Sequence, residues 1–327
     1  MGNGEGRMYR RDFLLGAVAA TAGLCSYQAD AAGTTLKIIY PYSPGSGGDV
    51  LARLLAQDIQ KKLGVTAIVE NKTGADGRIG VREVQRADPD GMTLLFTPFG
   101  AMVLFPTVFK DLPYNAFTDF TPITQVVTYD FGLAAGPMTD ARTLAQLLDW
   151  LKKNPAQNNV GVPGLGALPH LLPLKFAADS GISIQPIAYK GTGPALTDVM
   201  GGQIPLVCAP LGDLVGQAKA GTIKLLASSG KSRNALVPDV PTFIEQGYAI
   251  SGSGWYGMFA PSKTPPAEID KLNKLIVDSI HGDEFQAKAR ALWLTPTGTT
   301  SAELAAIQKA DYEQWAPVIK AAGLSGQ

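Results

Sequence analysis

The sequence predicts an α/β protein built from βα units around largely parallel sheets. Short apolar runs rich in branched residues alternate with stretches whose apolar residues recur at the helical period, and this alternation is typical of βα units. The chain has 327 residues, enough for two domains with substantial cores. Hydrophobic residues make up 46% and charged residues 17%, the balance of a soluble globular protein.

The first βα units are predicted between residues 36 and 96. Leu36–Tyr40 is a strand, and a loop rich in Gly and Pro follows it. The next helix has an apolar stripe and ends where Gly64 occupies the C′ position; the stripe comprises Leu51, Leu54, Leu55, Ile59 and Leu63. The elements that follow are a strand at Ala67–Glu70, a helix near Gly80–Ala87 and a strand at Thr93–Phe96.

The remaining elements continue the same pattern. Phe120–Ala135 is one long extended segment, which can leave the first α/β unit and enter a second. Thr143 and Gln146 have the spacing of a capping box at the start of a helix. Further strands are predicted at Asn159–Val162, Ile182–Ile187, Ile204–Cys208, Ile223–Ala227 and Trp255–Ala260, and further helices at Glu268–Ile280 and about Ala302–Ile319.

The N-terminus has the features of an export signal rather than of the fold. Arg10 and Arg11 precede an apolar run, Gly16–Leu24, that is too short to span a bilayer. The paired arginines favour a twin-arginine signal, and a Sec signal is the alternative. Ala29-Asp30-Ala31 is a small-x-small cleavage pattern, so residues 1–32 are predicted to be a signal peptide and the mature protein to be periplasmic.

Composition argues against several classes of protein. The 28 basic and 28 acidic residues give a net charge of zero, so the electrostatic footprint of a nucleic-acid binder is missing. Cys208 is the one cysteine after the signal, which excludes an internal disulfide. His170 and His281 lack the spaced partners of a metal site. No nucleophile elbow, phosphate-binding loop or dinucleotide fingerprint is present, so we expect no catalytic residue, no metal and no cofactor.

Two glycine-containing loops are the candidate binding elements, because each follows a predicted strand and opens a helix. In Pro41–Asp49 the glycines allow close approach to backbone N–H groups, and the helix N-terminus favours an anion. Asp49 stands where an N-cap is wanted, so capping is its expected role. Candidate residues in the first loop are Tyr42, Ser43, Gly45, Ser46, Gly47 and Asp49, and those in the second are Gly164, Leu165, Gly166, Ala167, Leu168 and His170.

Eight short motifs together resemble one known family. In order they are Pro41–Asp49, Val69–Gly77, Pro89–Leu95, Leu112–Tyr114, Tyr189–Gly191, Pro194–Asp198, Gly201–Gln203 and Pro238–Thr242. Each motif alone is weak, but their order and spacing are specific and cover essentially the whole mature chain. They resemble the Bug family, the extracytoplasmic receptors of tripartite tricarboxylate transporters.

The resemblance implies a type II periplasmic-binding-protein fold, in which two α/β lobes are joined by two crossing strands and enclose a ligand. It implies that one lobe comprises residues 33–128 and 251–327, and the other residues 129–250. It also implies that the partners are a small organic carboxylate and the membrane permease subunits of a transporter. We expect a monomer.

The sequence departs from the family at two places that bear on the ligand. The family usually has Ser or Thr where Ala167 and Leu168 stand, so hydroxyl donors are missing there. Many relatives have an acidic residue near Ala209 that pairs with a ligand ammonium, and burying an unpaired ammonium is costly. We therefore expect a carboxylate without an ammonium and with an apolar or aromatic body, placed against Tyr42, Phe99, Leu165 or Trp255. Core packing is an equally good explanation for these aromatic residues.

Three functions are compatible with these observations to different degrees. Capture of a small carboxylate for transport is the leading hypothesis. A periplasmic ligand sensor for a signalling receptor would use the same cleft, so the sequence does not separate the two. An exported hydrolase is the weakest hypothesis, because no nucleophile and base are paired in the sequence.

Overall fold

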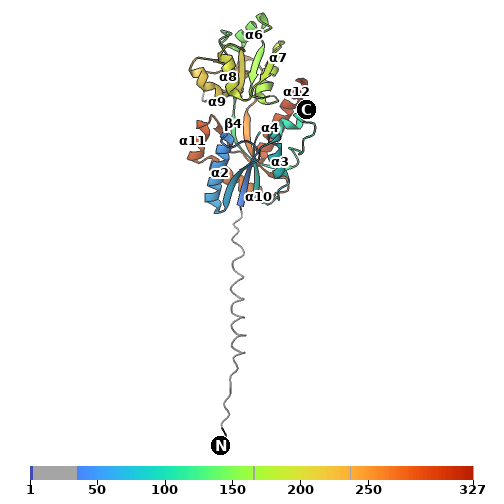
Figure 1. Cartoon of the computed structure of the whole chain (residues 1–327), viewed down its shortest axis with the longest axis vertical. Helices are drawn as coiled ribbons and strands as arrows, with labels where there is room; N and C mark the ends of the chain where they lie inside the picture. The colour runs from blue at the N-terminus through green and yellow to red at the C-terminus, as the bar shows by residue number, and fades with distance from the viewer. Residues whose placement is uncertain (3–34, 165, 236, 327) are drawn as a thin grey trace.

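The computed structural model describes residues 1–2, 35–164, 166–235 and 237–326. In these residues the chain forms two α/β lobes stacked along the long axis of the molecule (Figure 1). The predicted α/β class with two lobes is therefore confirmed. Leu165 and all but the first two residues of the predicted signal peptide lie outside the described residues.

Lobe 1 contains a six-stranded sheet with the order β11-β4-β10-β3-β1-β2. Strand β1 pairs in parallel with β2 and β3, whereas β10 is antiparallel to β3 and β4. The strands are β1 (Thr35–Tyr40), β2 (Thr66–Asn71), β3 (Thr93–Pro98), β4 (Phe120–Tyr129), β10 (Gly254–Pro261) and β11 (Thr295–Pro296). The helices are α2 (Gly47–Leu63), α3 (Arg78–Gln85), α4 (Gly100–Val103), α5 (Phe105–Val108), α10 (Pro266–Ile280), α11 (Asp283–Ala291) and α12 (Ser301–Ala321).

Lobe 2 contains a five-stranded sheet with the order β7-β6-β8-β5-β9. Strand β6 is parallel to β7 and β8, and β5 is antiparallel to β8 and β9. The strands are β5 (Phe131–Ala135), β6 (Asn159–Val162), β7 (Gln185–Ala188), β8 (Leu206–Pro210) and β9 (Lys224–Ser228). The helices are α6 (Leu144–Lys153), α7 (Leu168–Ser180), α8 (Thr192–Met200) and α9 (Leu211–Lys219).

Local sequence signals explain where several helices begin and end. Helix α2 starts after Ser46, whose side chain accepts from the Asp49 N–H, and it ends at Gly64 with φ 69°. The Thr143 hydroxyl caps α6, but Gln146 accepts from the N–H of Arg142 rather than from that of Thr143. The apolar stripe of α2 is buried at Leu51, Leu55 and Ile59. Leu63, the last residue of α2, is 36% exposed, so the buried part of the stripe ends before the helix does.

The chain crosses between the lobes twice, and the crossings are bonded to each other. The predicted extended segment is two strands, β4 in lobe 1 and β5 in lobe 2, with Asp130 between them. The second crossing precedes β10. Ser253 Oγ donates to Asp130 Oδ1 at 2.6 Å, and the N–H of Phe131 donates to Ser229 Oγ at 2.9 Å. The first bond joins the crossings directly, and Ser229, just after β9, links them again because its hydroxyl donates to the Gly252 carbonyl at 2.6 Å.

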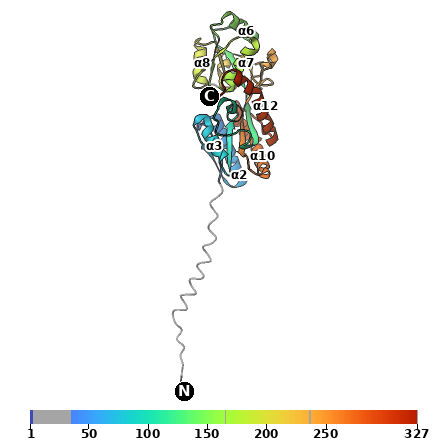
Figure 2. The same cartoon turned by 90° about the vertical axis from the view of Figure 1, so that its right-hand side faces the viewer.

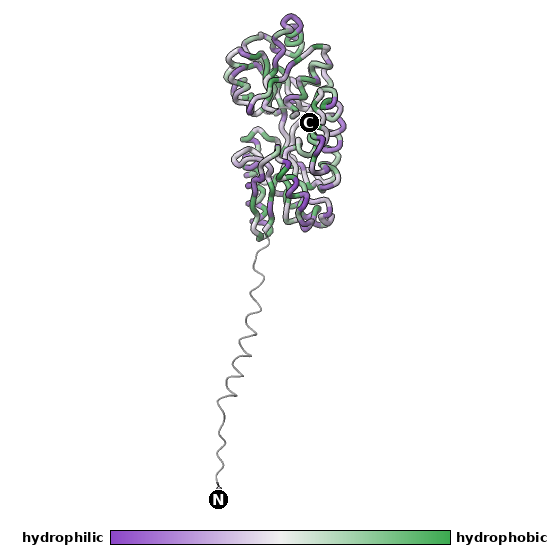
Figure 3. The backbone as a smooth tube through the Cα atoms, turned by 45° about the vertical axis from the view of Figure 1, so that its right-hand side comes forward, coloured by the Kyte–Doolittle hydropathy of each residue, from purple (hydrophilic) through white to green (hydrophobic). Residues whose placement is uncertain are grey.

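The lobes share a hydrophobic core on the side of α12. One cluster of buried residues includes Phe99 and Trp255 of lobe 1, Leu133 and Leu168 of lobe 2, and Trp315 of α12. Figure 2 shows α12 running up one side of the molecule toward lobe 2. Figure 3 shows hydrophobic stretches of backbone inside both lobes. The opposite side, where α9 and α11 face each other in Figure 1, is the side of the candidate site.

Candidate functional site

A cavity of about 410 Å³ lies between the two lobes, within the size range of small-molecule sites. Five segments form it: the start of α2, the end of β4 with the first crossing, the junction of β8 and α9, β10 next to the second crossing, and the turn after α11. Its lining residues are Gly47, Tyr129, Asp130, Pro210, Leu211, Gly212, Asp213, Tyr256, Ala291, Leu292, Trp293 and Leu294.

The two glycines at the start of α2 have different roles. A Cβ on Gly47 would lie 3.9 Å from the nearest atoms of Leu292 and Leu294, which is ordinary contact. A Cβ on Gly48 would lie 2.5 Å from the Tyr40 hydroxyl and 2.7 Å from the Tyr256 ring. Gly48 is therefore required by packing, whereas Gly47 brings bare backbone to the cavity wall. The positive end of the α2 dipole and the backbone N–H groups at its start favour an anion at this end.

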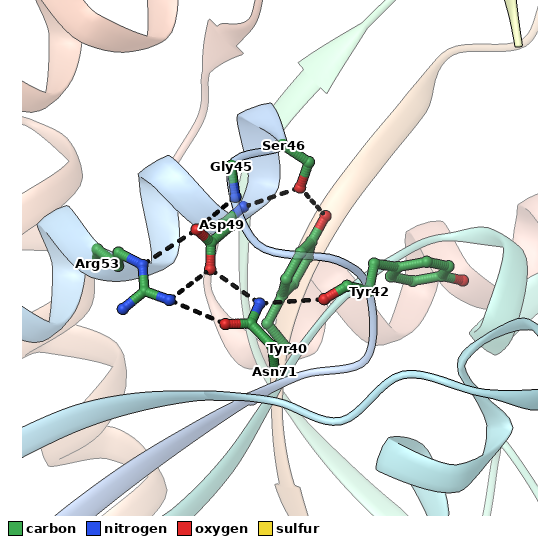
Figure 4. Close-up of polar contacts among 7 residues, drawn as sticks. All are labelled: Tyr40, Tyr42, Gly45, Ser46, Asp49, Arg53 and Asn71. Carbon is green, nitrogen blue, oxygen red and sulfur yellow. Dashed lines mark hydrogen bonds and ion pairs between the residues drawn. The ribbon is translucent and has the colours of Figure 1, made fainter.

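Asp49 is not the N-cap of α2, contrary to the prediction; Ser46 has that role and Asp49 is the third residue of the helix, in its first turn. Its carboxylate accepts from the Gly45 N–H at 2.9 Å, from Arg53 Nε and Nη2 at 3.0 Å, and from Asn71 Nδ2 at 2.9 Å (Figure 4). Burial opposes the charged form, but the hydrogen bonds outweigh it, and the pKa of Asp49 lies below its usual value. Asp49 therefore holds the loop in place and is not among the described residues that line the cavity.

Tyrosine rings form the floor of the cavity at the crossings. Tyr129 and Tyr256 have ring centroids 5.8 Å apart, and Tyr256 stacks on Phe96 at 5.3 Å. Tyr40 lies behind them and shares a 2.9 Å hydrogen bond with the Ser46 hydroxyl. Burial raises the pKa of Tyr129 and of Tyr256, so both hydroxyls stay protonated at neutral pH, and that of Tyr256 is hydrogen-bonded to Tyr40.

Two carboxylates, Asp130 and Asp213, line the cavity and were missed by the sequence reasoning. Asp130 accepts from Ser253 and from Asn234, and Asp213 Oδ2 accepts from Thr192 Oγ1 at 2.7 Å. Among the described lining residues there is no Lys, Arg or His. Asp130 directly follows β4 and Asp213 lies in the first turn after β8. The sequence signal that could have identified both residues is their position just beyond the end of a strand, because ligands of α/β folds bind at the carboxyl ends of strands.

A second hollow of about 620 Å³ adjoins the cavity and shares Asp130 and Leu294 with it. Segments of both lobes line it, and they contribute Lys231, Arg233 and Arg290. Arg233 is bonded to both carboxylate oxygens of Glu245, at 2.9 and 3.0 Å. Cationic side chains therefore lie beside the cavity but outside its lining.

The second predicted loop packs between the lobes instead of lining this cavity. A Cβ on Gly166 would lie 3.8 Å from Val108 of α5. The Gly166 N–H donates to His170 Nδ1 at 2.9 Å, which assigns the ring proton to Nε2, and burial lowers the pKa of His170. Ala167 occupies the N-cap of α7 without a side-chain hydrogen bond, and Leu168 is buried in the shared core. Gly164 belongs to the same loop.

The other predicted residues do not converge on the cavity. Phe99 and Trp255 are 4% and 1% exposed and pack against each other at 6.1 Å, as the core-packing alternative proposed. Ala209 is buried in the lobe 2 core.

In the first loop Ser43 and Gly45 are exposed, and the Tyr42 hydroxyl donates to the Asp76 carbonyl at 3.3 Å. Of the predicted residues that the structure describes, only Gly47 lines the cavity.

The described part of the chain contains neither a metal-binding cluster nor a membrane-spanning helix. It holds no group of three or more His, Cys, Asp or Glu side chains that could bind a metal ion. Within the same residues, no helix has the length and apolarity needed to cross a membrane. Cys208 is fully buried, and burial raises the pKa of its thiol, which leaves it protonated.

A family model and a curated relative both match most of this sequence. Residues 51–324 match the family model described as the tripartite tricarboxylate transporter family receptor. A curated relative is the UPF0065 protein in the TAR-I ttuE-ttuC' intergenic region of Agrobacterium vitis. It is 31% identical over 315 residues, which cover 94% of this chain and 91% of the relative.

Three solved structures share the fold over nearly their whole length. The periplasmic binding protein BugD is 32% identical with a TM-score of 0.72, over 90% of this chain and 99% of BugD. R. palustris Rpa4515, solved with adipate, is 26% identical with a TM-score of 0.75, over 90% and 98% of the two chains. MatC from Rhodopseudomonas palustris, with bound malate, is 26% identical with a TM-score of 0.71, over 87% and 98%.

Proposed function

This chain belongs to the tripartite tricarboxylate transporter receptor family, and from this premise we propose that it captures a small organic carboxylate between its lobes for delivery to a transporter. The observation that carries the proposal is the cavity between the lobes, which the bare backbone of Gly47 at the start of α2 helps to line. The adipate and malate bound to two similar structures are small dicarboxylates, and they support the proposed ligand class.

The arrangement suits a ligand with one anionic end and an apolar body. A carboxylate at the N-terminus of α2 would accept from backbone N–H groups, each charged hydrogen bond contributing about 1.5–3 kcal/mol. Leu292 and Trp293 form one wall of the cavity, and Tyr129 and Tyr256 form its floor. Because both lobes contribute lining residues, a bound ligand stabilises the closed arrangement by the contacts that only this arrangement offers.

The structure changes the argument about a ligand ammonium. The sequence predicted a ligand without an ammonium, because Ala209 offers no charge to pair with it. In the structure Ala209 lies in the core of lobe 2. Asp130 and Asp213 bring carboxylates to the cavity from other segments, so an ammonium or hydroxyl has acceptors there. The proposed ligand is therefore a carboxylate with a largely apolar body, and hydroxy and amino derivatives belong in the test.

The proposed setting is the periplasm, reached through the predicted signal at residues 1–32. The proposed partners are the membrane permease subunits of a tripartite transporter, with the receptor acting as a monomer. No reaction is proposed at the cavity: its two carboxylates already accept hydrogen bonds from Ser253, Asn234 and Thr192, and its relatives are receptors and binding proteins.

A thermal-shift screen of the mature protein tests this proposal. The panel consists of mono-, di- and tricarboxylates, aromatic acids, hydroxy acids and amino acids. A ligand at 100 times its Kd should stabilise the folded protein by about 2.7 kcal/mol. Calorimetric titration then measures the affinity of each hit. The proposal fails when no carboxylate, with or without a hydroxyl or amino group, raises the melting temperature.

A further inference from the structure

Trp293 has a backbone conformation that is unusual for a bulky residue. It follows α11 with φ 61°, in the left-handed region where glycine is the common residue and an aromatic side chain is an outlier. Its N–H donates to the Arg290 carbonyl at 3.0 Å, and the Leu294 N–H donates to the Ala289 carbonyl at 2.9 Å. Ending α11 in this way requires only a residue with a left-handed backbone, and glycine would be sufficient. Contacts outside its own helix must therefore explain why this residue is a tryptophan.

That cause lies across the cleft, in lobe 2. A Cβ on Gly212 of α9 would lie 2.5 Å from the Trp293 Cβ and 2.8 Å from its Cγ, so glycine is needed for this approach. The indole packs against the apolar cluster of Leu211, Val215 and Val237. Lys219 Nζ lies 5.3 Å from the ring centroid, within the range of a cation–π contact. A side chain of lobe 1 is thus seated on α9 of lobe 2.

We infer that Trp293 is the positioning residue that docks α9 over the cavity and couples ligand capture to closure of the lobes. Trp293 and Gly212 both line the cavity, so their contact closes the cavity on one side and orders its wall. Bonds within lobe 1 hold the left-handed backbone of Trp293, whereas the contacts that hold its side chain come from α9 of the other lobe. Separation of the lobes would remove them.

The inference rests on the proposed function for its ligand, but the docking contact can be tested without one. Gly212→Ala places a methyl group where Trp293 lies and prevents docking. Gly216→Ala is the matched control, because Gly216 is in the same helix and its Cβ would meet nothing within 4 Å. Both changes replace glycine by alanine in α9 and have similar effects on helix propensity.

Tryptophan quenching measures docking directly. In a Trp150→Phe background the remaining tryptophans are Trp293 and the buried Trp255 and Trp315, each 1% exposed. Acrylamide should therefore quench mainly Trp293. We expect quenching to increase in Gly212→Ala and to stay at the level of the background protein in Gly216→Ala.

Affinity measures the coupling to the ligand. For a carboxylate that stabilises the wild type, we expect Gly212→Ala to weaken binding by at least about tenfold and Gly216→Ala to stay within about twofold. Trp293→Gly removes the ring but suits the left-handed backbone, so affinity should fall without loss of thermal stability. Adding Trp293→Gly to Gly212→Ala should cause little further loss, because both changes break the same contact.

The outcomes separate this inference from the proposed function. Equal quenching and equal affinity in Gly212→Ala and Gly216→Ala would overturn the role of Trp293, even in a protein that binds carboxylates. Increased quenching with unchanged affinity would overturn the coupling. If the wild type binds no carboxylate, the proposed function fails, while the quenching experiment still decides whether Trp293 docks α9.

Discussion

At the scale of single residues, the loop before α2 shows how a buried charge shapes a binding element. Asp49 is 3% exposed and receives hydrogen bonds from backbone and side chains on several sides. Arg53 and Asn71 are bonded to each other as well, at 2.8 Å. A buried carboxylate is tolerated when its oxygens are satisfied in this way. Asp49 therefore sets the path of the loop, while Gly47 faces the cavity.

Replacing Asp49 tests this role. Asp49→Ala leaves the Gly45 N–H and one N–H of the Asn71 amide without an acceptor, and we expect the free energy of unfolding to fall by about 1–3 kcal/mol. Asp278→Ala is the control, because it removes an exposed pair with Lys274 at the same helical spacing and should cost at most about 0.5 kcal/mol. Urea denaturation measures both.

The same variant has a predicted pH dependence. The pKa of Asp49 is lower in the folded protein than in the unfolded chain, where it is about 3.9. The stabilisation by Asp49 is therefore complete above that value and is lost as pH falls through the lower folded pKa. Denaturation curves of the wild type and Asp49→Ala should converge in acid. A constant difference down to the lowest accessible pH would contradict the proposed network.

The neighbouring glycines provide a second residue-scale prediction. Gly47→Val adds bulk at the cavity wall where a Cβ has room, so we expect the fold to be kept and most ligand affinity to be lost. Gly48→Ala forces its methyl group into Tyr40 and Tyr256, and overpacking of this kind costs about 1–3 kcal/mol. Melting temperature and ligand titration of the two variants distinguish these effects; similar loss of stability in both would contradict the assignment.

At the scale of elements, the two candidate loops differ in how they begin their helices. Helix α2 starts on the Ser46 hydroxyl, which Tyr40 also contacts. Helix α7 starts at Ala167 without a side-chain cap, and its loop is held by the bond from Gly166 to His170 instead. Gly166 has φ 72°, a conformation that suits glycine. The loop before α7 is therefore held by the imidazole of His170, whereas the loop before α2 ends in a capping hydroxyl.

This difference predicts an acid-sensitive loop. Burial lowers the pKa of His170, so the unfolded chain takes up a proton first, near pH 6.5. Stability contributed by neutral His170 is complete above that pH and declines as pH falls toward the folded pKa, by at most about 1.4 kcal/mol per pH unit. Protonated Nδ1 also no longer accepts from Gly166.

Thermal melts between pH 7.5 and pH 5 measure this effect. Wild type and the control His281→Gln, which changes an exposed histidine, should lose stability in parallel. His170→Gln removes the titrating group, so its pH dependence should be shallower even though its stability at pH 7.5 is lower. Identical slopes for all three proteins would show that His170 does not hold the loop.

At the scale of the whole molecule, the two sides of the lobe interface are built differently. On the α12 side the lobes share a continuous apolar core, and Trp315 lies so close to Gly252 that a Cβ there would be 2.5 Å from the ring. On the other side the cavity lies between them, and Trp293 of lobe 1 packs against α9 of lobe 2. Opening is therefore expected about the α12 side and the two crossings, with the α9 side moving most.

Export is also a property of the whole chain and has a direct test. Replacing both Arg10 and Arg11 by lysine should leave a twin-arginine substrate in the cytoplasm. Cell fractionation of the full-length protein measures the distribution, and a periplasmic protein with a known Sec signal serves as the control. Normal export of the double variant would favour the Sec alternative.

The sequence alone determined those features that depend on local signals. The alternation of strands and helices, the end of α2 at Gly64 and the capping hydroxyl of Thr143 follow from periodicity and from residues a few positions apart, and the structure confirms them. The family resemblance rested on motifs in order along the chain, and the family match confirms it. None of these inferences required knowing which distant segments meet.

Only the tertiary structure decided which side chains reach the cavity. Gly47 and Gly48 are neighbours in sequence, yet contacts with Tyr40, Tyr256 and Leu292 assign one to the cavity and the other to packing. Ala209 and Phe99 lie in cores, while Asp130, Asp213 and Trp293 come together from three separate segments. The face that a residue presents is set by the segments packed against it, and these are distant in sequence.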